Sequence, residues 1–348
     1  MHALPTRSRS PSAPASQSSS RIACSTRRPR RRGRCNGMKP ALDNLEWALQ
    51  RRLDDVFAKL GEKYGDLTGR VEMAIRPAVT FDEIGGLPQA KETLRGFASA
   101  LSTPERYREW GIEPPKGLLL YGPPGTGKAM LARALAGAAE AIFYHLKLMN
   151  LTSKFAANTA ELLQEVLRIA VGEGRGVLLL DEIDALSLDH LLPPPQAREA
   201  SARLIAALCE KLDAMDPSRL LVVGATIRTD ALDPALVAPG RLDHLVEVTL
   251  PDAAAQREIL ELMRSRTEKN AGRALYETLD FRTILPMMGG MSGADIKEIL
   301  RRALEAKVRQ TVRQGTAPLV TSADLLEAIE GYKRVRGVVE KIRYGQYL

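Results

Sequence analysis

The chain has 348 residues, and 45% of them are hydrophobic, which is enough to bury a sizeable core in one large or two modest domains. Its apolar runs are only strand-sized, as at Gly117–Tyr121, so we expect no membrane span. Cys24, Cys35 and Cys209 have no spacing typical of a disulfide framework or a metal site, which favours a reducing compartment.

The net charge of +8 is concentrated at the N-terminus. Residues 1–37 contain nine arginines and no acid, so the rest of the chain is close to neutral and nucleic acid is an unlikely partner for it. Arginine, serine and proline with few apolar residues cannot offset the entropy lost on ordering, so we predict a disordered tail over 1–37. Its role is open between an RNA-binding or transit-like arm and an extension without function before Met38.

An amphipathic helix is predicted over 41–65, because apolar residues recur at spacings of three or four. These residues are Leu42, Leu45, Leu49, Leu53, Val56 and Leu60. The helix can form a short coiled coil between subunits or pack on the body of the chain. The repeated spacing of four at Leu45, Leu49 and Leu53 breaks a heptad register, so the second arrangement is at least as good.

Strand-like apolar runs and helical patterns alternate through the next part of the chain. The runs cover 117–121, 142–146, 177–180, 220–225 and 245–250. This alternation predicts an α/β domain over 78–251, with a parallel sheet covered by helices on both faces. Only helical patterns follow, and they predict an α-helical lid domain over 252–336. We expect the last residues, 337–348, to form a flexible C-terminal tail. The helical patterns lie at 252–266, 293–314 and 321–335, the last with a capping box at Thr321 and Asp324.

A glycine-rich loop lies between the strand 117–121 and a helical run at Ala129–Ala139. Its residues are Gly122, Pro123, Pro124, Gly125, Thr126, Gly127 and Lys128. Such a loop turns backbone N–H groups toward phosphates, and Lys128 reaches the β and γ oxygens of a nucleotide. Position 129 is normally Ser or Thr, a direct ligand of Mg²⁺. Ala129 has no oxygen to offer, so we expect weaker metal binding.

Two acids, Asp181 and Glu182, follow the apolar strand at 177–180. In nucleotide hydrolysis one carboxylate orients hydrated Mg²⁺ and the next polarises the attacking water. Alone, this pair also fits the capped end of a strand. Its place about 55 residues after the phosphate loop favours the catalytic interpretation.

Together these motifs resemble those of the AAA+ ATPases, in the group of the proteasomal ATPases, FtsH-type proteases and valosin-containing unfoldases. The resemblance covers about 81–335. Besides the loop and the acid pair, it depends on the segments 81–87, 111–117, 232–236, 239–241 and 291–295. It implies a P-loop NTPase fold with a helical lid, ATP and Mg²⁺ as cofactors, and a homo- or hetero-hexameric ring that acts on polypeptide in the cytoplasm.

The resemblance also implies roles for residues outside the two motifs. Ile84, Gly85, Gly293 and Ala294 would surround adenine. Arg241 would reach across a subunit boundary to the neighbour's γ-phosphate, with an ordinary surface ion pair as the alternative. Phe155 would line the central pore and grip polypeptide, or else pack in the core.

Three positions depart from the family pattern in the same direction. The first is Ala129, the second is Ile227 at the family's polar sensor Asn, and the third is Ala238 at the first of two arginine fingers. Each removes a polar group from the γ-phosphate environment, where one such group can contribute about 100-fold in rate. We therefore expect ATP binding to survive better than hydrolysis.

The chain ends in Gln346, Tyr347 and Leu348 after a glycine, as bacterial proteasomal ATPases do. The resemblance implies that this tail inserts an aromatic ring and a terminal carboxylate into a pocket of a proteasome core particle. The segment between the helix predicted over 41–65 and Phe81 is too short for the OB domain that such ATPases carry. Two functions remain: an ATP-driven unfoldase or remodelling subunit with weakened hydrolysis, or a degenerate capping subunit that uses nucleotide for assembly only.

Overall fold

The computed structural model describes residues 39–64, 71–148, 156–186, 195–315 and 318–343. The tail predicted over 1–37 lies outside these residues. Glu46–Leu348 forms one compact unit, separate from Met1–Leu45, and the description below concerns that larger unit.

A six-stranded sheet has the strand order β1-β3-β4-β5-β2-β6. Its strands are β1 (Val71–Ile75), β2 (Gly117–Tyr121), β3 (Ile142–Lys147), β4 (Gly176–Asp181), β5 (Leu220–Thr226) and β6 (His244–Glu247). The pairings among β2 to β6 are parallel, which confirms the predicted α/β class. The edge strand β1 was not predicted and runs antiparallel to β3, so the sheet is mixed.

The last strand is shorter than the predicted run at 245–250. It pairs with β2, and Glu247 is the register partner of Tyr121, the final residue of that strand. Beyond Glu247 the partner strand has ended, so the ladder ends too.

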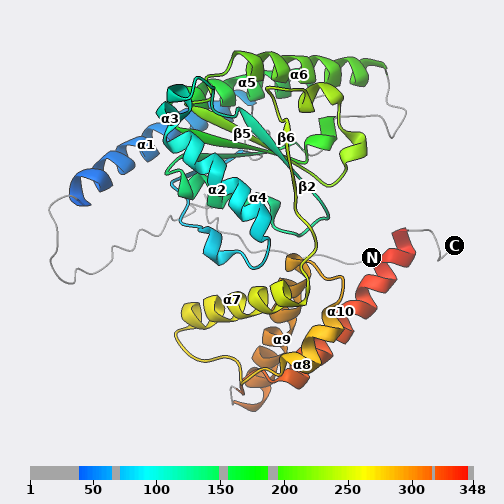
Figure 1. The fold of residues 1–348 in the computed structure, drawn as a ribbon. Coiled ribbons are helices and arrows are strands. Elements are labelled where there is room, and N and C mark those ends of the chain that lie inside the picture. Colours follow the sequence, from blue (N-terminus) through cyan, green and yellow to red (C-terminus); the bar gives the residue numbers. More distant parts are fainter. Residues whose placement is uncertain (1–38, 65–70, 149–155, 187–194, 316–317, 344–348) are drawn as a thin grey trace, which may run out of the picture. The chain divides into compact units, whose positions relative to one another are not determined.

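Helices cover both faces of the sheet (Figure 1). One face carries α2 (Pro88–Ser102) and α4 (Lys128–Ala138), and the other carries α5 (Ala156–Gly172) and α6 (Pro195–Ala214). Alternate residues of β2 enter the two cores: Leu118 and Leu120 pack with the first pair of helices, and Leu119 packs with the second. Residues buried on both faces explain why these strands are continuous apolar runs in the sequence.

Shorter helical elements connect the strands. They are α3 (Pro104–Glu109) and the 3₁₀ turns η2 (Phe81–Glu83), η3 (Ile183–Leu186), η4 (Thr229–Ala231) and η5 (Pro234–Val237).

The N-terminal helix α1 (Lys39–Tyr64) packs on the body of the chain through its described part. Leu53 and Leu60 are buried in the same core as α5 and α6, while Leu49 and Val56 are partly buried against it. Of the two predicted arrangements, the structure therefore adopts packing on the body. The stripe that a coiled coil would use is occupied there.

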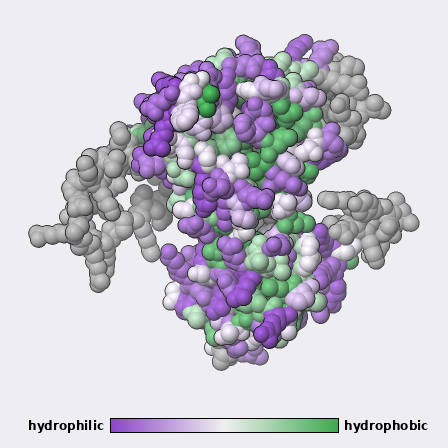
Figure 2. All heavy atoms as spheres, viewed as in Figure 1, coloured by the Kyte–Doolittle hydropathy of each residue, from purple (hydrophilic) through white to green (hydrophobic). Residues whose placement is uncertain are grey.

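After the sheet, the described part of the chain is helical, as predicted, apart from one isolated bridge between Tyr276 and Val320. The helical elements are α7 (Ala253–Ala271), α8 (Phe281–Ile284), η6 (Leu285–Met288), α9 (Gly293–Gln314) and α10 (Ser322–Arg343). Their apolar faces build a separate core that includes Leu260, Ile296 and Ile329. On the face drawn in Figure 2, polar residues lie over most of the surface with smaller apolar areas between them, as amphipathic helices require.

The helix α10 is longer than the sequence pattern indicates. It continues through Arg343, so a flexible tail beginning at residue 337 is wrong for residues 337–343. The predicted capping box at its start is present, because Asp324 N donates to Thr321 Oγ1 and Thr321 N donates to the Asp324 carboxylate. No helix in the described part of the chain is long and apolar enough to cross a membrane.

Candidate functional site

The phosphate loop joins the end of β2 at Tyr121 to the start of α4 at Lys128, the context predicted for it. Gly122, Gly125 and Gly127 all have positive φ, at 144°, 76° and 98°. A Cβ on Gly122 would lie 2.2 Å from the carbonyl oxygen of Val248, so only glycine fits there. The backbone thus has the compact turn that a phosphate requires at a helix N-terminus.

Lys128 is buried, and its ammonium group bends back over the loop. Its Nζ donates to the carbonyl oxygens of Gly122 and Pro123, both at 2.8 Å. Burial lowers the pKa of the Lys128 ammonium, and the carboxylates of Asp181 and Asp184 oppose that shift. The lysine is therefore within electrostatic range of Asp181 and Asp184, as a site that binds anionic phosphates requires.

The acid pair lies at the end of β4, next to that loop. Asp181 is the last residue of the strand, and Glu182 follows with a left-handed φ of 57°. Asp181 Oδ1 accepts a hydrogen bond from Glu182 N at 3.1 Å, and Asp181 Oδ2 lies 3.0 Å from His145 Nε2. Burial raises the pKa of the Glu182 carboxyl, with Asp181 and Asp184 adding to the shift. A carboxylate of raised pKa is a better proton acceptor than an ordinary one.

A second polar contact links the end of β5 to Asp184, two residues after Glu182. Thr226, 1% exposed at the end of that strand, donates through Oγ1 to Asp184 Oδ1 at 2.6 Å. Ile227 comes next, with 49% of its surface exposed. The position predicted to lack a polar sensor is thus an exposed apolar side chain, while the hydroxyl beside it is already bonded to Asp184.

The lid contacts the phosphate loop through the start of α9. Ala294 N donates to Gly125 O at 3.1 Å, and a Cβ on Gly125 would lie 2.7 Å from Ser292 Oγ. Ser292 caps α9 in a reciprocal box with Asp295. The predicted nucleotide residues Gly293 and Ala294 therefore lie against the loop.

Of the other pair predicted to surround adenine, Gly85 lies against the lid at a different helix, α7. Ile84 is buried in the core, and a Cβ on Gly85 would lie 2.6 Å from Ile259 Cγ1 of α7. The neighbouring Gly86 N donates to the Glu258 carboxylate of the same helix at 2.8 Å.

Arg241 has partners within its own chain. Its Nε and Nη2 donate to the two carboxylate oxygens of Asp213 at 2.8 and 2.7 Å, and its Nη1 donates to Ala235 O at 2.6 Å. The hydrogen bond from Arg241 lowers the pKa of the Asp213 carboxyl. This is the ion pair named above as the alternative, so a role for Arg241 across a subunit boundary stays a prediction. Ala238 lies partly buried on the loop just before it.

Phe155 and the tail residues Gln346, Tyr347 and Leu348 lie outside the described residues, so their predicted roles stay predictions. Within the described part of the chain there is no cluster of three or more His, Cys, Asp or Glu residues able to hold a metal ion by themselves. Asp181 alone still fits hydrated Mg²⁺, because that ion commonly uses one or two carboxylates together with substrate phosphates and keeps several waters.

His145 and Glu72 were missed by the sequence analysis. His145 is 5% exposed on β3, and Glu72 lies beside it on β1 as its register partner. The available signal was one histidine inside the otherwise apolar run 142–146.

Comparisons with known proteins agree with this geometry. Residues 118–250 match the family described as "ATPase family associated with various cellular activities (AAA)". The chain belongs to this family of AAA ATPases, in the group that includes the proteasomal ATPases.

The similar proteins include several named proteasome-activating nucleotidase. The one from Saccharolobus solfataricus is 34% identical over 298 residues, which cover 85% of this chain and 73% of that protein. Those from Aeropyrum pernix and Thermococcus onnurineus are each 35% identical, over 82% and 84% of this chain and 68% and 70% of their own lengths. The chain is therefore an ATPase.

Proposed function

We propose that this chain binds ATP with Mg²⁺ as a subunit of a hexameric ring, homomeric or mixed, and uses hydrolysis to unfold or remodel polypeptide for a proteasome core. The observation that carries this proposal is the joint placement of the glycine loop, the buried Lys128 and the acid pair at the ends of β2 and β4. The name of its relatives, proteasome-activating nucleotidase, supports the choice of partner. We expect a protein with this function to be located in the cytoplasm.

Within the site, each residue has a proposed role that follows from its chemistry. The loop backbone from Gly122 to Gly127 cradles the phosphates, and Lys128 exchanges its carbonyl partners for phosphate oxygens. Asp181 orients hydrated Mg²⁺, and Glu182 takes the proton of the attacking water. Ile84, Gly85, Gly293 and Ala294 hold adenine between the sheet and the lid, and Arg241 acts on the neighbour's nucleotide.

Hydrolysis is slow in this proposal, because three groups near the γ-phosphate are missing. Ala129 offers no metal ligand, Ile227 no hydrogen bond to water and Ala238 no guanidinium. The same residues favour a second candidate function, a capping subunit that binds nucleotide for assembly and leaves hydrolysis to a partner. The exposed apolar side chain of Ile227 is the observation that favours it.

Steady-state release of phosphate tests the enzymatic function. We expect slow Mg²⁺-dependent turnover that falls by about 100-fold or more in Glu182→Gln, because the variant loses its general base. Equal rates in the wild type and the variant would contradict a catalytic role for this site. A fast wild-type rate that disappears in the variant would keep the site and reject weakened hydrolysis.

Docking on a proteasome is tested separately. Phe155 is proposed to grip polypeptide in the pore, and Gln346, Tyr347 and Leu348 to enter the pocket of the core particle. A pull-down of purified core particle with the full chain, and with Tyr347 and Leu348 deleted, should recover the core only with the full chain. Equal recovery would reject the role of the tail while leaving the ATPase function intact.

A further inference from the structure

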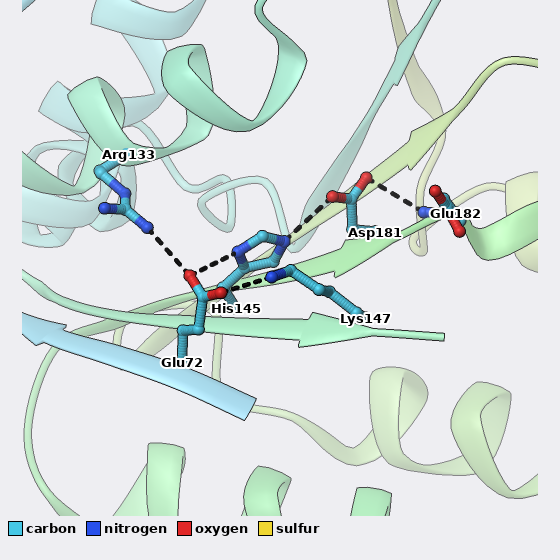
Figure 3. Close-up of polar contacts among 6 residues, drawn as sticks. All are labelled: Glu72, Arg133, His145, Lys147, Asp181 and Glu182. Atoms are coloured by element: carbon cyan, nitrogen blue, oxygen red, sulfur yellow. Dashed lines mark hydrogen bonds and ion pairs between the residues drawn. The ribbon is translucent and has the colours of Figure 1, made fainter. Parts of the chain in front are cut away.

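A buried histidine connects two carboxylates behind the nucleotide site (Figure 3). His145 Nε2 lies 3.0 Å from Asp181 Oδ2, and Nδ1 of the same ring lies 3.5 Å from Glu72 Oε2. The three residues come from three neighbouring strands, since β3 lies between β1 and β4. The imidazole thus lies between a carboxylate of the edge strand and the end of the strand that carries the acid pair.

The direction of the bond to Asp181 follows from its chemistry. An ionised carboxylate only accepts hydrogen bonds, so His145 Nε2 carries the hydrogen in this contact. Asp181 Oδ1 already accepts from Glu182 N. Both carboxylate oxygens are therefore held by donors, and the rotation of the carboxyl group is restricted.

Glu72 is itself held from two sides. Lys147 Nζ forms an ion pair with Glu72 Oε1, and Arg133 Nη2 of α4 lies 3.5 Å from Oε2. The hydrogen bond from Lys147 lowers the pKa of the Glu72 carboxyl, so this carboxylate is ionised at neutral pH. Its Oε2 lies beside the imidazole, but among the described residues His145 Nδ1 has no hydrogen-bond partner, so the hydrogen bond that holds the ring is the one from Nε2 to Asp181.

We propose that His145, through the contact of its Nε2 with Oδ2, is a positioning residue that fixes the Asp181 carboxylate for the hydrated Mg²⁺ of bound nucleotide. The inference depends on the proposed function, because it assigns Asp181 to the metal. Partners that orient a metal-binding carboxylate from behind commonly change metal affinity by about 10–100-fold when they are removed.

Such support matters more in this chain than in one with a complete loop. Ala129 supplies no oxygen, so Asp181 is the one side chain that we assign to the metal. An error in its orientation is then not corrected by a second protein ligand. The polar support behind Asp181 thus offsets part of what the loop has lost.

A merely structural role for His145 is the alternative. The ring centroid lies 6.0 Å from that of Phe143 on the same strand, so the side chain also packs in the core. In that case substitutions would lower stability and nucleotide affinity equally with and without metal. Positioning predicts a change that appears only when Mg²⁺ is present.

The test measures the affinity of the full chain for a fluorescent ADP analogue, first in EDTA and then in a Mg²⁺ titration. His145→Leu removes the donor. His145→Gln keeps an amide N–H near the position of Nε2, whereas the amide of His145→Asn is too short to reach Asp181. Phe143→Leu is the matched control, since it weakens the same core and leaves the donor in place.

We expect His145→Leu and His145→Asn to raise the Mg²⁺ concentration for half-maximal effect about tenfold, with affinity in EDTA unchanged. His145→Gln should stay within about threefold of the wild type, and Phe143→Leu should match it despite a lower melting temperature. An unchanged Mg²⁺ requirement in His145→Leu, or equal behaviour of the Gln and Asn variants, would overturn the inference. If His145→Leu does not fold, the comparison of Gln with Asn decides.

The two proposals fail in different ways. A wild-type chain whose nucleotide affinity does not respond to Mg²⁺ would contradict the metal site in the proposed function. A wild-type response that every His145 variant shares would leave that site in place and reject only the positioning role.

Discussion

The two halves of the nucleotide site differ in how many polar side chains they keep. At the end of β4, Asp181 is bonded to His145, and Asp184 accepts a short hydrogen bond from Thr226. In contrast, Ala129 at the start of α4 and Ile227, directly after Thr226, are apolar at positions where the family pattern has polar residues. The acids are thus held in a fixed arrangement, while the groups expected to touch the phosphate and water directly are reduced.

From this difference we expect nucleotide binding to be better preserved than hydrolysis. In the proposed function the loop binds phosphates through backbone N–H groups and through Lys128, neither of which depends on the missing side chains. Turnover depends on charges and hydrogen bonds at the γ-phosphate, and the loss of each such group lowers the rate of hydrolysis. Binding and hydrolysis should therefore separate experimentally.

The largest effect on the loop half is expected from Gly125→Ala. The φ of Gly125 is 76°, and the new Cβ would lie 2.7 Å from Ser292 Oγ and 2.8 Å from the Cβ of Ala294. Strain of about 1–3 kcal/mol should push the lid off the loop, and calorimetric titration should show nucleotide affinity weaker by about tenfold.

Gly174→Ala is the control for that variant. Gly174 also has a positive φ, at 113°, but a Cβ there meets nothing within 4 Å. It should carry the backbone strain without the contact, and nucleotide affinity should not change. Equal loss of affinity in both variants would show that strain alone, and not the contact with the lid, is responsible.

A smaller effect is expected from Ser292→Ala, which removes the cap of α9. Loss of an N-cap hydroxyl costs about 1 kcal/mol, so thermal unfolding should begin about 2–4 °C lower. Because Ser292 also packs against the phosphate loop, bound nucleotide should raise the melting temperature less than it does in the wild type.

Thr321→Ala likewise removes a capping hydroxyl, here at the start of α10 and together with one methyl group. It should lower the melting temperature to a similar extent, with the full stabilisation by nucleotide retained. If both variants respond alike to nucleotide, the contact of α9 with the loop is not part of the binding site.

The sequence was sufficient for the parts of the fold that depend on local pattern. The five parallel strands, the glycine loop and the acid pair follow from apolar runs and short motifs, and the structure has each of them. The strand β1 was missed because Val71–Ile75 has one polar residue, Glu72, and so lacks the regular alternation that indicates a strand. The end of α10 was missed because the helix continues beyond the apolar pattern used to predict it.

The support behind the acid pair could not be predicted, because it depends on long-range pairing. Glu72, His145 and Asp181 are far apart in the chain, and only the antiparallel register of β1 on β3 brings the first two together. The partner of Arg241 is a similar case, since Asp213 lies on α6 and no local spacing links the two. Motifs identified the residues predicted to act on nucleotide, and the fold was needed to identify what holds them.

The central claim is that hydrolysis is limited by missing polar groups and not by the acids. Phosphate release by the wild type and by a double variant, Ala129→Thr with Ile227→Asn, tests it most directly. We expect the double variant to be faster by about 100-fold, with the gain lost again when Glu182→Gln is added. A double variant that folds, binds nucleotide and releases phosphate no faster than the wild type would contradict the account.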